Sequence, residues 1–213
     1  MRLEEELKYY ESQLLFMLSK VRQMIQMAQE AIKTNDKEKA LNIIEMDDVV
    51  NHVDEEINHR ASEMLSLLQP VAKDLRAIIA GIKISTDIER IGDYAKNVGR
   101  YVIKNDALSE NVINLTVKLI DQVLHQLDDL YEALKTSDVK AAYIIPDNDQ
   151  KVDDAFLEAV TYIEDKIQAN SKDFKYPVFL ISMLRNLERA GDHVKNICES
   201  IIYKTKGQHI DFG

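Results

Sequence analysis

Apolar residues recur three and four positions apart along most of this 213-residue chain. That spacing places them on one face of a helix, and it continues through six long stretches separated by short polar or proline-containing breaks. The breaks lie near residues 34–36, 69–70, 104–106, 136–138 and 170–173. With only 6 glycines and 3 prolines in the chain, few residues favour turns. The pattern therefore predicts an all-α protein of six long helices joined by short connections.

The six stretches form two copies of one unit. Residues 31–40 (AIKTNDKEKA) align with 133–142 (ALKTSDVKAA) with five identities in ten. Residues 87–98 (DIERIGDYAKNV) align with 186–197 (NLERAGDHVKNI) with six identities in twelve. One match lies at the first helix junction of each copy and the other in its third helix. Because the two placements are equivalent, internal duplication explains the matches better than chance.

This duplication predicts two tandem three-helix bundles, one over residues 1–105 and the other over residues 106–207, followed by a C-terminal tail at 208–213. The copies are offset by 102 residues in the first match and by 99 in the second, so they differ in length by three residues between the matches. Pro146 lies inside the fifth stretch, where it predicts a kink or a late helix start.

Composition and charge limit the classes of function. The net charge of −10 repels phosphate backbones, and the basic residues are scattered among acids, so we expect no nucleic-acid binding. No apolar run approaches the roughly 20 residues of a membrane span, and the opening MRLEEELKYY has no signal-like apolar segment. The single cysteine, Cys198, cannot form an internal disulfide. These features predict a soluble, cytoplasmic protein.

Acidic side chains are the clearest candidates for chemistry. The candidate donors are four oxygen-bearing side chains in each copy, two from its second helix and two from its third: Asp47, Asn51, Glu89 and Asp93 in the first copy, and Asp149, Asp153, Glu188 and Asp192 in the second. Oxygen donors that converge from two helices suit hard cations such as Mg²⁺ or Mn²⁺, and also iron. Zinc is an option as well, although it more often attracts histidine or cysteine.

A solvated acidic face is the simpler explanation for the same residues. Carboxylates four residues apart on a helix repel each other only weakly when they are exposed. Lys96 follows Asp93 by three residues, and Lys195 follows Asp192 in the same way, so each lysine can form an ion pair with its aspartate. The pattern occurs at both equivalent positions, which keeps the metal explanation open beside this one.

A glycine lies in the middle of the third helix of each copy, at Gly92 and Gly191. Glycine within a helix costs on the order of 1 kcal/mol relative to alanine, so some neighbour must need the space. Close approach of another helix is the structural explanation, and close approach of a ligand is the functional one. We favour the structural explanation.

No arrangement typical of catalysis is recognisable, because the chain has neither a glycine-rich phosphate loop nor a Ser-His-Asp set. Glu56 and His59 have the Glu-x-x-His spacing of di-iron bundles, but the second copy that such sites need is missing. We therefore expect a protein that is not an enzyme. The alternative from another class is a carboxylate-bridged metal-binding bundle with storage or oxidase activity.

Taken together, these motifs resemble the PhoU family of accessory regulators of bacterial phosphate uptake. The resemblance is carried by residues 47–51 (DDVVN), 69–76 (QPVAKDLR), 87–93 (DIERIGD) and 186–192 (NLERAGD), and it covers residues 4–207. It implies two three-helix bundles side by side. It also implies a negative regulator of phosphate uptake and the phosphate-starvation response.

The resemblance further implies partners and a metal. The partners would be the ATPase subunit of the phosphate ABC transporter and a phosphate-sensing histidine kinase, with the membrane reached only through them, and we also expect a homodimer. By matching positions, the metal would be held by the acidic residues named above. The first copy has Asn51 where the second has Asp153, which removes one negative charge and should weaken the first site.

Overall fold

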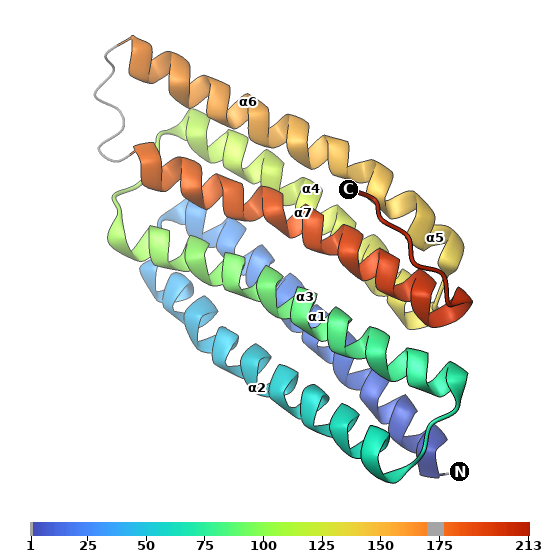
Figure 1. The fold of residues 1–213 in the computed structure, drawn as a ribbon. Helices are drawn as coiled ribbons and strands as arrows, with labels where there is room; N and C mark the ends of the chain where they lie inside the picture. Colours follow the sequence, from blue (N-terminus) through green and yellow to red (C-terminus); the bar gives the residue numbers. More distant parts are fainter. Residues whose placement is uncertain (1, 170–176) are drawn as a thin grey trace.

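The structure is a computed structural model that describes residues 2–169 and 177–213. Its helices, shown in Figure 1, are α1 (Arg2–Thr34), α2 (Lys37–Leu67), α3 (Ala72–Lys104), α4 (Glu110–Thr136), α5 (Val139–Ile144), the 3-10 helix η1 (Ile145–Asn148), α6 (Asp149–Gln168) and α7 (Pro177–Lys206). No β-strand occurs in the described residues. The predicted all-α architecture is therefore confirmed. The predicted break at 170–173 lies outside the described residues.

The fifth predicted helix is interrupted at Pro146, as expected. The chain forms the short helix α5, then the 3-10 turn η1 with its proline in the first turn, and only then the long helix α6. Proline has no backbone N–H and its ring clashes with the preceding turn, so a continuous α-helix across this position is unfavourable. As a result, α6 begins at Asp149, one of the candidate site residues.

The first helix junction has the same backbone in both copies. Asn35 and Ser137, which are 102 residues apart, both adopt a left-handed conformation, with φ values of 50° and 51°. Each is followed by an aspartate that caps the next helix: Asp36 accepts a hydrogen bond from the Lys39 backbone N–H, and Asp138 accepts one from Lys140. The duplication inferred from sequence is thus present in the backbone as well.

The two predicted bundles pack side by side. Helices α1, α2 and α3 form one bundle, and α4 to α7 form the other, with α3 against α7 as the most extensive contact of the fold. Figure 1 shows α3 and α7 running in opposite directions along this contact. The apolar stripe of α3 at Ile84, Ile88 and Ile91 is at most 1% exposed, which places it within the core. Within the described ranges, no helix has both the length and the apolar character needed to cross a bilayer.

The C-terminal tail folds back along α7 after a turn at Gly207, which has a φ of 69°. The His209 ring stacks on Tyr203 with ring centroids 4.5 Å apart. The Phe212 backbone N–H donates a hydrogen bond of 2.9 Å to Glu199. The tail is therefore held against α7 by specific contacts, although it is not helical.

Candidate acidic sites between paired helices

Each bundle contains one cluster of the predicted acidic residues. Acidic site 1 lies between α2 and α3, and acidic site 2 lies between α6 and α7. Acidic site 1 consists of Asp47, Asn51, Glu89, Asp93 and Lys96, and acidic site 2 consists of Asp149, Asp153, Glu188, Asp192 and Lys195.

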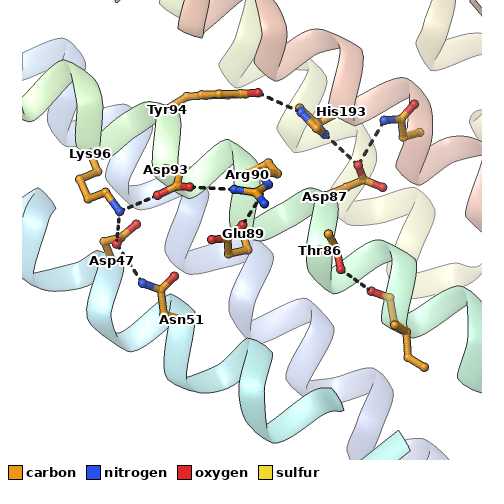
Figure 2. A network of polar contacts seen from close by, with 12 residues as sticks. Asp47, Asn51, Thr86, Asp87, Glu89, Arg90, Asp93, Tyr94, Lys96 and His193 are labelled. Carbon is orange, nitrogen blue, oxygen red and sulfur yellow. Dashed lines mark hydrogen bonds and ion pairs between the residues drawn. The ribbon is translucent and has the colours of Figure 1, made fainter.

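In acidic site 1, a lysine joins carboxylates from two helices (Figure 2). The Lys96 Nζ lies 2.6 Å from an oxygen of Asp47 on α2 and 2.5 Å from an oxygen of Asp93 on its own helix. The Asn51 amide donates a third hydrogen bond, of 3.1 Å, to the same Asp47 oxygen. The side chain of Asp47 is only 3% exposed, so this carboxylate depends on the protein for its counter-charge.

Acidic site 2 repeats this arrangement. The Lys195 Nζ lies 2.8 Å from Asp149 on α6 and 3.0 Å from Asp192 on α7. The side chain of Asp149 is 8% exposed and that of Lys195 is 16% exposed. The predicted ion pairs of the two lysines are therefore present, and each lysine also reaches a buried aspartate on the neighbouring helix, which the sequence did not show.

The two glycines make room for these helix pairs. A Cβ at Gly191 would lie 2.2 Å from an oxygen of Asp149, a distance that atoms cannot adopt without rearrangement. At Gly92 the nearest atoms belong to Val21 and Val50, at 3.3 and 3.4 Å. Close packing accounts for both glycines, and at Gly191 the group that needs the space is a carboxylate of the site itself.

Several buried oxygens near the sites have no hydrogen-bond donor. In and beside acidic site 1 these are one oxygen of Asp47, one oxygen of the neighbouring Asp54 and the amide oxygen of Asn51. Positions 47, 51 and 54 follow helical spacing, so the three side chains share one face of α2. A buried acceptor without a partner costs about 1–3 kcal/mol. Such oxygens are suitable ligands for a cation, and the donor set thus fits the predicted metal.

Two residues with such an unpartnered oxygen, Asp54 and Gln126, were not predicted from the sequence. Asp54 lies one turn beyond Asn51 and can be found on a helical wheel, because it extends the same face. Gln126 of α4 is 2% exposed, donates to Asp149 over 3.3 Å, and has a buried amide oxygen without a partner. Its counterpart in the first copy, at the offset of 102, is the apolar Met24. The repeat therefore gave no signal for it.

Burial and neighbouring acids alter the ionisation of the sites. Burial raises the pKa of Glu89 above its ordinary value, and Asp93 raises it further. Burial and Asp192 raise the pKa of Glu188 in the same way. A carboxyl whose pKa is higher in the folded chain opposes folding once it ionises, so its contribution to stability falls as pH rises above about 4.5. A cation bound beside these carboxylates would favour their ionised form and so oppose this loss of stability.

The lysines are held in their charged form. Burial alone would lower the pKa of Lys195, but its hydrogen bonds to Asp149 and Asp192 raise that pKa above the ordinary value. The Lys96 pKa is raised for the same reasons. In the part of the chain that is described, no three His, Cys, Asp or Glu side chains are grouped to hold a metal ion as they stand. Instead, each ammonium contacts two carboxylates: Asp47 and Asp93 for Lys96, and Asp149 and Asp192 for Lys195.

A second polar network joins the two bundles (Figure 2). The His193 ring on α7 contacts the Tyr94 hydroxyl over 3.1 Å through Nε2 and Asp87 over 2.8 Å through Nδ1. Asn196 donates to the same oxygen of Asp87 over 3.2 Å. The network therefore fixes α7 against α3 next to acidic site 1.

This fold defines a class of protein: two packed copies of a helical bundle, each with a lysine-bridged acidic site between its last two long helices. Residues 14–102 and 116–201 match the model of the PhoU domain. The match covers most of the chain and includes both copies. The chain belongs to the PhoU family, and the family expected from the sequence motifs is confirmed.

Individual relatives agree with this assignment. The chain is 26% identical to the "Phosphate-specific transport system accessory protein PhoU homolog 1" of Thermotoga maritima, over 97% of this chain and 90% of the relative. It is 29% identical to the PhoU accessory protein of Edwardsiella tarda, over 95% of this chain and 84% of the relative. The crystal structure of the PhoU regulatory protein of Streptococcus pneumoniae superimposes with a TM-score of 0.90, at 25% identity, over 98% and 99%. The crystal structure of PhoU from Pseudomonas aeruginosa also superimposes with a TM-score of 0.90, at 29% identity, over 96% of this chain and 99% of that one.

The buried ion pair of acidic site 2 leads to a stability prediction. We expect Lys195→Met to lower the free energy of unfolding of the metal-free chain by about 3 kcal/mol, because Asp149 stays buried without a counter-charge. Denaturant unfolding measures this change. The control is Lys118→Met, whose ion pair with Glu158 has side chains 55% and 51% exposed, and it should cost less than about 1 kcal/mol. Equal stability of the two variants would contradict the structural role of Lys195.

Proposed function

We propose that this protein is an accessory regulator of phosphate-specific transport, which restrains phosphate uptake and keeps the phosphate-starvation response off when phosphate is plentiful. The observation that carries this proposal is the family match, which includes both copies of the repeat. The named relatives are accessory or regulatory proteins of the phosphate transport system, and the alignments cover nearly all of this chain. None of these names suggests the storage or oxidase alternative.

In this role the chain acts as a non-enzymatic adaptor in the cytoplasm. It would contact the ATPase subunit of the phosphate ABC transporter and a phosphate-sensing histidine kinase, and its long helices offer extended surfaces for both. The membrane is then reached only through the transporter. The homodimer expected from the resemblance belongs to the same proposal.

The acidic sites are proposed to bind a metal cation in place of the lysine ammonium. The unpartnered oxygens of Asp47, Asn51 and Asp54 support this, because they are acceptors already buried on one face of α2. When bound, the metal would supply the positive charge that joins α2 to α3. Oxygen donors favour Mg²⁺, Mn²⁺ or iron over zinc. Lys96 would leave its carboxylates, since the ammonium and the metal would compete for the negative charge of Asp47 and Asp93.

We propose that Asp54 offsets the charge that the first site lacks at Asn51. Asn51 lacks the charge of Asp153, but Asp54 supplies a carboxylate one turn further along α2. The position equivalent to Asp54 in the second copy, at the offset of 102, is Phe156. Each site thus has four carboxylates, differently placed, and we propose that both sites bind metal.

The metal proposal is tested by a double substitution in acidic site 2. We expect Glu188→Gln with Asp192→Asn to remove the metal of that site while acidic site 1 keeps its own, because two charged oxygen donors are lost. Mass spectrometry of the metal content after loading with Mn²⁺ and desalting measures this. The matched control is Asp154→Asn with Glu158→Gln, two exposed acids with the same spacing on α6. Unchanged metal content in the site variant would exclude this site.

The regulatory proposal is tested in cells. We expect a strain lacking this gene to show high output from a phosphate-starvation reporter in phosphate-rich medium, since the restraint on the response is lost. The intact gene on a plasmid should restore low output. Reporter output that stays low in the deletion strain would contradict the negative-regulator assignment.

A further inference from the structure

Gln126 brings a third helix to acidic site 2, because it lies on α4 whereas the other residues of the site come from α6 and α7. It is 2% exposed, and its Nε2 donates a hydrogen bond of 3.3 Å to Oδ1 of Asp149. Its amide oxygen is buried and has no hydrogen-bond donor. A buried oxygen of this kind has lost its water without a replacement, so it favours a ligand that it can bind.

Gly191 leaves the space in which this amide oxygen lies. A Cβ at Gly191 would be 2.2 Å from Oδ1 of Asp149 and 3.2 Å from Oε1 of Gln126. The two oxygens therefore lie close together beside the backbone of α7, next to Asp192 in the sequence and three residues after Glu188. Glycine at this position thus makes room for one anionic oxygen and one neutral oxygen within the acidic site.

The lysine of the site does not satisfy the amide oxygen. The Lys195 ammonium contacts Oδ2 of Asp149 and Oδ1 of Asp192, and Oε1 of Gln126 has no partner in the described residues. An ammonium has three hydrogens to donate, whereas Mg²⁺ or Mn²⁺ binds about six oxygen ligands. A metal ion can therefore use an acceptor that the lysine leaves unpaired.

The first copy has an apolar side chain at the same place. Position 126 corresponds to Met24 at the offset of 102, and the Met24 Cε lies 3.9 Å from the Cβ position of Gly92, the counterpart of Gly191. In the first copy a buried, unpartnered amide oxygen belongs instead to Asn51 on α2. Each copy therefore has such an amide oxygen, but in acidic site 2 it comes from a third helix.

This third helix also connects the site to the other bundle. α4 packs against α6 and α7 in its own bundle and against α1 of the first bundle. Two residues beyond Gln126, Asp128 forms an ion pair with Arg22 of α1. Asp121 accepts a hydrogen bond from Gln29 of the same helix. A ligand that fixes α4 at Gln126 therefore acts on a helix that belongs to the contact between the bundles.

We propose that Gln126 is a ligand of the cation in acidic site 2, so that this cation joins α4, α6 and α7. The inference rests on the metal binding proposed above. The amide oxygen binds the cation beside the carboxylates, while Nε2 holds Asp149 in place. Met24 offers no such link in the first copy, because a thioether is a soft ligand. Loading of acidic site 2 therefore reaches the contact between the bundles through α4.

The test measures Mn²⁺ binding to the full chain in which acidic site 1 is disabled by Glu89→Gln with Asp93→Asn. In this parent we expect Gln126→Met, which copies the first repeat, to weaken Mn²⁺ binding by about tenfold or more, since even residues that only support metal ligands cost that much. Titration calorimetry measures the dissociation constant. The matched control is Gln122→Met, one turn earlier on α4, which should leave the affinity unchanged.

A second variant, Gln126→Glu, separates a ligand from a residue that only positions Asp149. Its ionised carboxylate keeps an oxygen for the cation but has no hydrogen to donate to Asp149. We expect this variant to bind Mn²⁺ at least as tightly as the parent. A loss of affinity equal to that of Gln126→Met would overturn direct ligation.

Hydrogen–deuterium exchange tests the link to α4. Saturating Mn²⁺ should slow exchange in α4, α6 and α7 of the parent, but only in α6 and α7 of Gln126→Met. Equal protection of α4 in both chains would refute the link. If Gln126→Met does not fold, as judged by its melting temperature, Gln126→Leu takes its place.

The two levels of the proposal fail in different ways. A parent that binds no Mn²⁺ would contradict the metal proposal itself, and this inference with it. Mn²⁺ binding by the parent that the folded Gln126→Met or Gln126→Leu variant leaves unchanged would contradict the role of Gln126 alone.

Discussion

A carboxylate buried between two helices requires a positive charge, and in each half of this molecule a lysine on the neighbouring helix provides it. Asp47 and Asp149 are nearly inaccessible to solvent, so without Lys96 and Lys195 their charges would oppose the packing of α2 on α3 and of α6 on α7. The glycine at 191 lets the carboxylate reach this position. The acidic motif is thus part of the helix packing, and a solvated face does not describe Asp47 and Asp149, because both are buried.

The sequence predicted most of the fold because the relevant signals are local. Helical periodicity, the polar breaks between helices and the proline at 146 each act within a few residues, and the duplication made the first two signals appear in both copies. The acidic residues that the structure brings together were also identified from the sequence, since each helix of a site sets the spacing of its own pair. Gln126 was not, because α4 brings it to the site by tertiary packing and its counterpart is Met24. The position of the tail was not predicted either, because residues 208–213 have no periodicity that indicates what they pack against.

The two copies have the same backbone but have diverged where they could serve different purposes. One acidic site has Asn51 with Asp54, and the other has Asp153 with Gln126 from α4. One groove on the α3 and α7 contact is bordered by the chain's own tail at His209 and Ile210, whereas the described lining of the other comes from α3, the adjoining Asn105 and α7. The duplicated fold therefore contains two lysine-bridged acidic sites that are similar but not identical.

The central claim is that each acidic site has one cation position, which a lysine ammonium and a metal ion occupy in turn. Labelling of lysines with an acylating reagent, followed by peptide mass spectrometry, tests it directly. Without metal, Lys96 and Lys195 should react more slowly than the exposed Lys73, because their side chains are only 14% and 16% exposed and their charged form is stabilised. Addition of Mn²⁺ should make both lysines react faster. Binding of Mn²⁺ that leaves their labelling rates unchanged would contradict the claim.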